Sequence, residues 1–158
     1  MQTDLQAELK QTRPFRSPVE ELFVGLQRTA AVLEHAFETA LKPSGTTSTQ
    51  YNVLRILRGA GDQGLCRTEV GARMVRRVPD VTRLLDRMEE AGYIARTRGG
   101  DDRRYVTTRI TPAGLQILAE LDRVVLAFLD RYTDVIDAHT LPVLNEGLSA
   151  LRRATDRS

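Results

Sequence analysis

The sequence contains one cysteine, Cys66, and no tryptophan, and aromatic residues make up only 5% of its 158 residues. A lone cysteine cannot build a disulfide framework, which argues against a small secreted domain and favours a reducing cytoplasm. The chain has no apolar run near the roughly 20 residues that a membrane-spanning helix needs. Its first residues are polar, unlike a secretory signal. The sequence therefore predicts a one-domain cytoplasmic protein with no membrane partner.

Patterns typical of enzymes and metal sites are also missing. The only histidines, His35 and His139, have no nucleophile, orienting acid or second metal ligand at a suitable spacing. Asp101 and Asp102 offer an alternative, because paired aspartates can hold Mg²⁺ for nucleotidyl transfer. Two arginines follow them directly, however, and no glycine-rich phosphate loop accompanies them. We therefore expect no enzyme, no metal and no cofactor.

Lysine is scarce, since Lys10 and Lys42 are the only lysines among 23 basic residues. The net charge is only +2, but arginine is concentrated in the middle of the chain while acidic residues are spread along its whole length. Arginine suits phosphates and base edges because its planar group donates two parallel hydrogen bonds. An arginine-biased genome would give the same composition. The concentrated residues are Arg73, Arg76, Arg77, Arg83, Arg87, Arg96, Arg98, Arg103, Arg104 and Arg109.

The first half of the chain reads as helical. After a polar arm over residues 1–17, apolar residues recur at three- and four-residue steps from Pro18 to Leu41, which predicts one long amphipathic helix. Ser48 or Thr49 is expected to cap the next helix, which runs to about Gly59.

The sequence pattern in the middle of the chain predicts two helices and a hairpin. A short helix is expected over about 67–74, followed by a turn. Pro79 fits the first position of the next helix, where its missing N–H costs nothing, and this helix should run to Ala91. Two strands over 93–98 and 105–110 are joined by a loop centred on Gly-Gly-Asp-Asp. The apolar stripe of the second helix consists of Val81, Leu84, Leu85 and Met88.

A helix restarts at Thr111 and Pro112, and apolar residues keep heptad spacing through the last two helices, as Leu118, Leu121, Val125, Phe128 and Tyr132 and then as Leu141, Leu144, Leu148 and Leu151. The predicted fold is mainly α with a two-stranded β wing, a winged helix-turn-helix over 48–110. Dimerisation helices over 18–47 and 111–158 should flank it. These helices carry more apolar surface than so small a domain can cover, which predicts a homodimer.

The predicted helix from Pro79 to Ala91 has a polar face suited to double-stranded DNA. In a major groove arginine reads guanine, and threonine meets a polar edge or a thymine methyl group. Arginines just before the helix start are placed to bind a phosphate. The alternative is a solvated face held by ion pairs along the helix. The candidate residues of this face are Arg76, Arg77, Asp80, Thr82, Arg83 and Arg87.

The tip of the hairpin suits a minor groove. Asp102 and Arg104 are two residues apart on extended chain, so their side chains point the same way. A carboxylate that fixes a guanidinium suits an arginine inserted into a narrow groove. Arg98 and Arg103 would then meet phosphates. The alternative is a polar tip with a surface ion pair of little energetic value.

The segments TQYNVLRIL, TEVGARMVRRVPDVTRLLDRMEEAGYIAR and DDRRYVTTRITPAG resemble the MarR family of winged-helix transcriptional regulators. The most specific element is Asp102-x-Arg104 followed by Thr111-x-x-Gly114. The resemblance implies a ligand-responsive repressor that binds a palindromic operator as a homodimer, with Arg104 in the minor groove and Asp102 bracing it. The family usually has small hydroxyl residues at the start of this helix, where this chain has Val78-Pro79-Asp80.

The resemblance also implies a small aromatic or phenolic acid as effector, in a cleft that would involve His35, Tyr51 and Arg55. Cys66 is expected to begin a helix in a Cys-x-x-Glu capping box with Glu69. A helix N-terminus beside an arginine favours a reactive thiolate, so a thiol-based redox-sensing regulator is one alternative function. A winged-helix protein-interaction module without specific DNA binding is another.

Overall fold

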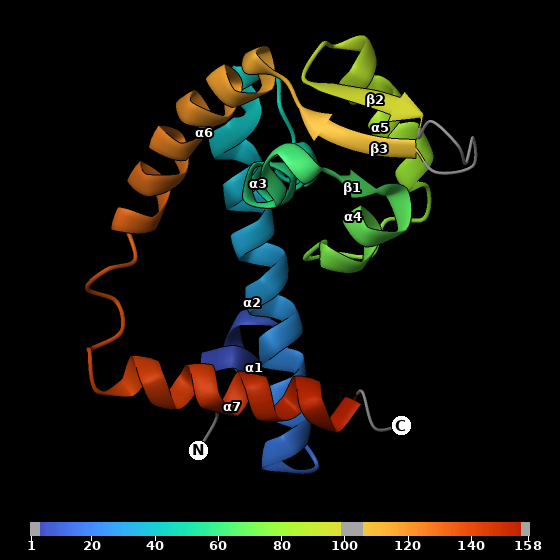
Figure 1. Ribbon diagram of the computed structural model, residues 1–158. Helices are drawn as coiled ribbons and strands as arrows, with labels where there is room; N and C mark the ends of the chain where they lie inside the picture. Colours follow the sequence, from blue (N-terminus) through green and yellow to red (C-terminus); the bar gives the residue numbers. More distant parts are fainter. Residues whose placement is uncertain (1–3, 99–105, 156–158) are drawn as a thin grey trace.

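The computed structural model describes residues 4–98 and 106–155 and is mainly helical (Figure 1). The helices, in chain order, are α1 Asp4–Glu8, α2 Pro18–Leu41, α3 Ser48–Ala60, α4 Arg67–Arg73, α5 Val81–Glu90, α6 Pro112–Asp130 and α7 Thr140–Thr155. The strands are β1 Leu65–Cys66, β2 Ile94–Arg98 and β3 Val106–Ile110, and short 3-10 turns cover Lys42–Ser44 and Gly61–Gln63. A winged helix-turn-helix is thus confirmed, with long helices on both sides of it.

The predicted starts of α2 at about Pro18 and of α6 at Thr111 and Pro112 are confirmed, while the cap of α2 was not predicted. Ser17 caps α2 by accepting a hydrogen bond from the N–H of Glu20, and Pro18 occupies the first helical turn. Thr111 caps α6 in the same way, with Pro112 behind it. These boundaries are local, because a cap and a proline satisfy or remove the free N–H groups of the first turn without help from the rest of the fold.

Two other helix starts were predicted wrongly. The cap of α3 is Thr47, whose hydroxyl accepts from the N–H of Gln50 while the Gln50 side chain accepts from the N–H of Thr47. Helix α5 begins at Val81 and not at Pro79. Asp80 is its cap, with a non-helical backbone and a carboxylate that accepts from the N–H of Arg83 at 2.9 Å. Pro79 therefore lies before the cap, outside the first turn of the helix.

The wing belongs to a three-stranded antiparallel sheet, whereas the sequence predicted two strands. The strand order is β1–β3–β2, and β3 pairs with β2 over its whole length. Leu65 and Cys66 of β1 pair with Thr108 and Thr107. A two-residue strand is too short to give an alternating pattern, so the sequence carried no signal for it.

The hydrophobic core lies where α3, α5 and the sheet meet the upper parts of α2 and α6 (Figure 1). Leu85 and Met88 of the predicted stripe on α5 are fully buried in it. The heptad residues of α6 pack against helices, as expected, but these helices belong to the same chain. They are Leu118, Leu121, Val125 and Phe128.

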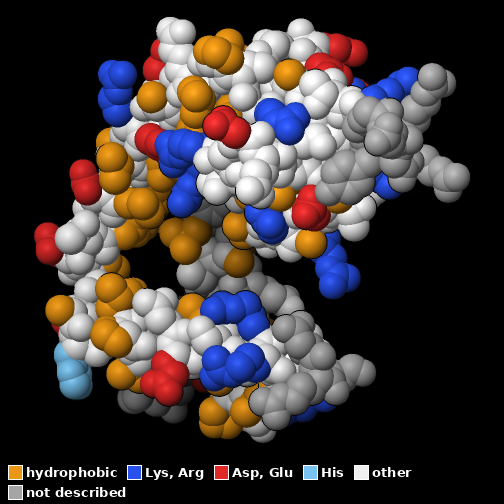
Figure 2. Space-filling model, viewed as in Figure 1, with side chains coloured by type: hydrophobic (Ala, Val, Ile, Leu, Met, Phe, Trp, Pro, Cys, Tyr) orange, Lys and Arg blue, Asp and Glu red, His pale blue; other side chains and the backbone are white. Residues whose placement is uncertain are grey.

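Apolar side chains that the chain leaves uncovered lie elsewhere on the flanking helices. None of the described residues of α7 is fully buried, and α2 buries only Leu41. The space-filling view is hollowed between α6 and α7, with hydrophobic side chains along the edge of the hollow (Figure 2). No helix among the described residues has both the length and the apolar character to cross a bilayer. The exposed apolar residues include Val19, Leu22, Phe23, Leu126, Leu129, Leu141, Val143 and Leu144.

Candidate nucleic-acid interface

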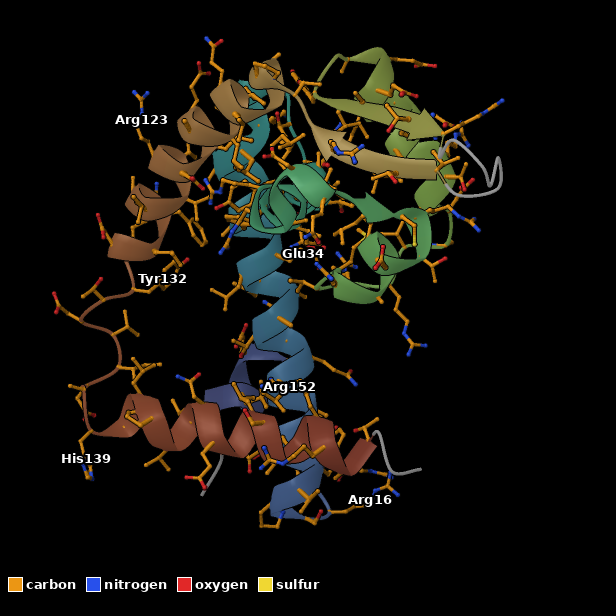
Figure 3. All side chains as sticks on the ribbon, viewed as in Figure 1. Arg16, Glu34, Arg123, Tyr132, His139 and Arg152 are labelled. Atoms are coloured by element: carbon orange, nitrogen blue, oxygen red, sulfur yellow. The ribbon has the colours of Figure 1, made fainter. Side chains whose placement is uncertain are left out.

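The turn between α4 and α5 is tied to two other helices. The N–H of Val75 donates to the Asn52 side chain of α3 at 3.0 Å. Arg76 forms an ion pair with Glu34, which lies on α2 at the level of this turn (Figure 3). The position of α5 is therefore coupled to the long helix α2. In this conformation Arg76 is engaged with a carboxylate of its own chain, while Arg77 is exposed.

The exposed face of α5 carries the arginines that the sequence singled out. Arg83 and Arg87 are one turn apart and exposed, and their guanidinium groups form no hydrogen bond or ion pair with any described residue. Asp80 is also exposed, but its carboxylate is used as the helix cap. Thr82 is exposed and accepts a hydrogen bond from Arg67 of α4. Arginine side chains stand out around α4 and α5 on the right of Figure 2.

Arg96 of β2 links helix α5 to the wing, and sequence reasoning missed this role. Its Nε donates to Glu89 at 2.8 Å, and its Nη2 lies 2.6 Å from carboxylate oxygens of both Asp86 and Glu89. The hydrogen bond from the Arg96 side chain holds the pKa of Glu89 below its usual value. Arg96 is therefore a structural residue between helix and wing. Spacing along the sequence could not reveal it, because the partners belong to different elements.

The interaction between Glu89 and Arg96 leads us to expect that the protein loses stability in acid. A carboxyl whose pKa is lower in the folded state stabilises the fold above its unfolded value of about 4.5, and this contribution is lost as the pH falls through the folded value. Glu89→Gln should therefore flatten the decline in the free energy of unfolding below about pH 4.5. Urea denaturation at pH 3 to 7 measures it. Glu90→Gln, at an exposed neighbour without an ion pair among the described residues, should keep the wild-type slope; equal slopes in all three proteins would refute the role of the pair.

Part of the predicted wing site lies outside the described residues. Arg98 ends β2, opposite Val106, and is exposed. Arg109, on β3, points to the body of the domain: its Nε donates to the Asp62 carbonyl at 2.6 Å and its Nη1 donates to Thr97 at 2.8 Å. Arg109 therefore holds the base of the wing. The candidate residues that lie outside the described part are Asp101, Asp102, Arg103 and Arg104.

The Thr-x-x-Gly element has a structural explanation. The Thr111 hydroxyl donates to the Gly92 carbonyl at 2.7 Å and accepts from the N–H of Gly114 at 3.0 Å. It thereby links the end of α5 to the start of α6 across the sheet. Gly114 lies so close to the Tyr93 carbonyl that a Cβ there would stand 2.1 Å from its oxygen. The motif therefore holds the start of α6 against the residues that connect α5 to the wing.

Tyr51 and Arg55 come together on α3, at its contact with α6. The Arg55 guanidinium carbon lies 5.7 Å from the centre of the Tyr51 ring. The buried Tyr51 hydroxyl donates to Asp122 at 3.0 Å, and Arg58 donates to the same carboxylate at 2.5 Å. Burial and the bond to Asp122 raise the pKa of Tyr51. The Tyr51 ring also contacts Phe37, which gives this region an aromatic and cationic character.

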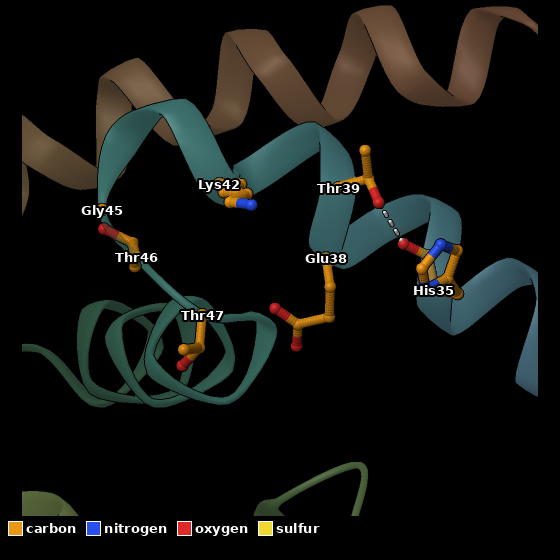
Figure 4. A pocket seen from close by; sticks show the side chains of 7 residues that line it. All are labelled: His35, Glu38, Thr39, Lys42, Gly45, Thr46 and Thr47. Atoms are coloured by element: carbon orange, nitrogen blue, oxygen red, sulfur yellow. Dashed lines mark hydrogen bonds between the residues drawn. The ribbon is translucent and has the colours of Figure 1, made fainter.

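His35 lies apart from this pair, on the wall of a cavity that neither Tyr51 nor Arg55 lines. The cavity has a volume of about 460 Å³ and lies between the last turns of α2 and the loop before α3 (Figure 4). Its lining residues are mostly polar, and Glu38 on its wall accepts hydrogen bonds from the N–H and hydroxyl of Ser48. The predicted cleft residues therefore do not form one site. The lining consists of His35, Glu38, Thr39, Lys42, Gly45, Thr46 and Thr47.

Cys66 occupies the predicted cap position of α4. Its N–H donates to the Glu69 carboxylate at 2.7 Å, which confirms the capping box, and this bond lowers the pKa of Glu69. The cysteine is half-buried and forms no disulfide. Over the described ranges no three His, Cys, Asp or Glu side chains gather as a metal site would require.

Residues 46–106 of the chain match the model of the MarR family. The chain is similar to the HTH-type transcriptional regulator FarR of Neisseria gonorrhoeae, with 24% identity over 143 residues, which cover 90% of this chain and 97% of FarR. It is 37% identical over 98 residues to the uncharacterized HTH-type transcriptional regulator YcgE of Bacillus subtilis (strain 168), which covers 60% of this chain and 61% of YcgE.

Solved structures share the fold. The transcriptional repressor CouR bound to a 23-mer DNA duplex superposes with a TM-score of 0.75 at 25% identity, over 89% of this chain and 99% of CouR. CouR from Rhodococcus jostii RHA1 bound to p-coumaroyl-CoA superposes with a TM-score of 0.71 at 24% identity, over 87% of this chain and 95% of CouR. AbsC, a MarR family transcriptional regulator from Streptomyces coelicolor, superposes with a TM-score of 0.78 at 19% identity, over 92% of this chain and 100% of AbsC.

Proposed function

This chain belongs to the MarR family and is a DNA-binding transcriptional regulator, not an enzyme, and we propose that it represses transcription as a homodimer on a palindromic operator. The observation that carries the proposal is the pair Arg83 and Arg87 on the exposed face of α5, whose guanidinium groups are not engaged by any described residue. Exposed arginines without such partners can donate hydrogen bonds to the edges of guanine bases in a major groove. A DNA target also implies a cytoplasmic protein.

The surrounding arginines fit contacts with the DNA backbone. Arg77 is exposed in the turn before α5, and Arg98 is exposed at the end of β2. Arg76 would have to leave Glu34 to reach a phosphate. We assign Arg104 to the adjacent minor groove, braced by Asp102, on the strength of the family motif. Two recognition helices in successive major grooves would require half-sites about one helical turn, or roughly 34 Å, apart.

The uncovered apolar side chains on α2, α6 and α7 support a homodimer. Monomeric proteins rarely expose large continuous apolar surfaces, and such surfaces mark interfaces. Leu126 and Leu129 on α6 and Leu144 on α7 are all exposed in the single chain. A second copy would cover them and would place two copies of α5 on the same side of the DNA.

We propose a small aromatic or phenolic acid as the effector that releases the repressor. The aromatic rings at Tyr51 and Phe37 suit a phenyl ring, and Arg55 offers its carboxylate a guanidinium. His35 and Lys42 line the separate cavity at the end of α2 and offer the acid a second anchor. The related fold of CouR binds p-coumaroyl-CoA. Such a ligand would act by favouring a dimer whose recognition helices have the wrong spacing.

The test is gel-shift binding to DNA from upstream of the protein's own gene. Wild type should bind this DNA in the nanomolar range. Arg83→Ala should lose about 1–3 kcal/mol of discrimination at the base pair that it reads. Arg104→Ala should weaken binding to all sequences. Arg123→Ala removes an exposed arginine from the far side of α6 and should bind like wild type (Figure 3).

The dependence of binding on sequence and on salt decides between this function and its alternative. Phosphate contacts make the logarithm of affinity fall with the logarithm of salt concentration by about 0.9 per contact. Weak binding that ignores sequence, salt and both substitutions, in this DNA and in duplexes selected from a random library, would favour a protein-interaction module instead.

A further inference from the structure

Arg67 contacts the recognition helix although it lies outside it. It is the first residue of α4, and its Nη1 donates to the hydroxyl oxygen of Thr82 on α5 at 3.1 Å. Both residues lie at the surface, where DNA can reach them. Gly71, one turn after Arg67, faces Val81 of α5: a Cβ at Gly71 would stand 3.5 Å from Val81 Cγ2, an ordinary contact distance, so the two helices pack directly against each other. The contact is thus set by the packing of α4 on α5.

We infer that Arg67 is a specificity-determining residue that acts through Thr82, an inference that rests on the proposed function. A threonine hydroxyl has one hydrogen to donate and two lone pairs that accept. Arg67 occupies one lone pair with a charged donor. Its positive charge disfavours a second donor approaching the same oxygen and strengthens the hydroxyl as a donor. Thr82 therefore meets the DNA as a hydrogen-bond donor.

This fixed polarity selects among the bases. In the major groove guanine presents two acceptors, N7 and O6, whereas cytosine presents the N4 amino donor. Adenine presents one acceptor and one donor, and thymine one acceptor and a methyl group. A hydroxyl held as a donor beside a guanidinium favours guanine and disfavours cytosine most strongly. Thr82 with Arg67 should therefore read guanine at the base pair that Thr82 faces.

A simpler role for Arg67 is contact with a phosphate, and the two roles make different predictions. Loss of a phosphate contact weakens binding about equally for all sequences and lowers the salt slope by about 1. Loss of a specificity determinant changes the preference at one base pair. The contact also predicts non-additivity, because removing either Arg67 or Thr82 removes the same interaction.

The experiment starts from an operator enriched from a random-sequence duplex library by the wild-type protein. Each base pair of this operator is then varied, and affinities are measured for wild type, Arg67→Ala, Thr82→Val and the double variant. Thr82→Val retains the shape and a methyl group but lacks the hydroxyl. Arg73→Ala is the matched control, since Arg73 is exposed at the other end of α4. Melting curves establish that each variant is folded.

Wild type should prefer guanine over cytosine by about tenfold at one base pair. Either single variant should reduce this preference below about threefold, and the double variant should reduce it no further. Arg73→Ala should keep the preference. Uniform weakening by Arg67→Ala with the preference intact would overturn the inference and leave the proposed function standing. If wild type enriches no sequence at all, the proposed function fails and the inference falls with it. Thr82→Val tests the contact alone if Arg67→Ala does not fold.

Discussion

Gly114→Ala should destabilise the protein by about 3 kcal/mol or more, because the added methyl group has no space. A Cβ at this position would stand 2.1 Å from the Tyr93 carbonyl oxygen and 2.8 Å from Ile110 Cγ1. Both neighbours belong to the sheet and its connection to α5, and the carbonyl is backbone that cannot rotate away. Relief requires α6 to move from the wing, which breaks the hydrogen bonds of Thr111. The melting temperature should fall by about 6–12 °C.

The matched control is another helical glycine. Gly59 lies on the exposed side of α3, and a Cβ added there would meet no atom within 4 Å. Gly59→Ala should stabilise the helix by a few tenths to about 1 kcal/mol, since alanine loses less backbone entropy than glycine. Urea denaturation midpoints of the two variants should therefore move in opposite directions. A Gly114→Ala protein as stable as wild type would show that α6 and the wing can separate without cost.

The elements that the sequence predicted best are those whose ends are decided locally. Ser17 with Pro18 and Thr111 with Pro112 begin α2 and α6 because the cap and the proline act within one turn. The start of α5 was different, because Pro79 and Asp80 offered two local solutions. Either a proline in the first turn or an aspartate cap satisfies the rules, and the hydrogen bond from Arg83 to Asp80 shows which one the chain adopts.

The sequence predicted which residues of the candidate site are exposed, but not which of them have partners within the chain. Apolar spacing on α5 assigned Arg83 and Arg87 to the solvent side correctly, because burial of Leu85 and Met88 fixes the rotation of the helix. What spacing could not give is which arginine is already engaged. Arg76 and Arg96 look no different in the sequence from Arg83, yet Glu34 of α2 binds Arg76 and Glu89 of α5 binds Arg96. Those partners follow from tertiary packing alone.

Leu129→Glu should convert the proposed homodimer into a folded monomer. In a two-fold interface every substitution occurs twice, and burying a leucine that is about half exposed contributes about 0.8–1.5 kcal/mol, half the value for a fully exposed side chain. The dimer therefore loses about 1.5–3 kcal/mol of apolar burial, or roughly 10- to 150-fold in dissociation constant, and the cost of burying an unpaired charge weakens it further. The single chain should fold normally, because Leu129 is already 54% exposed in it. Sedimentation equilibrium measures the change in mass.

The same substitution on the other end of α6 separates a dimer effect from a general effect of charge. Leu115→Glu changes a leucine that is 45% exposed and lies about 21 Å along the helix from Leu129. It should remain dimeric and bind the operator. Leu129→Glu should bind at least about 100-fold more weakly, because a monomer holds one half-site and forfeits the second. A Leu129→Glu protein that stays dimeric would place the interface elsewhere on α2 and α7, whereas a monomer with full affinity would remove the need for two copies on the DNA.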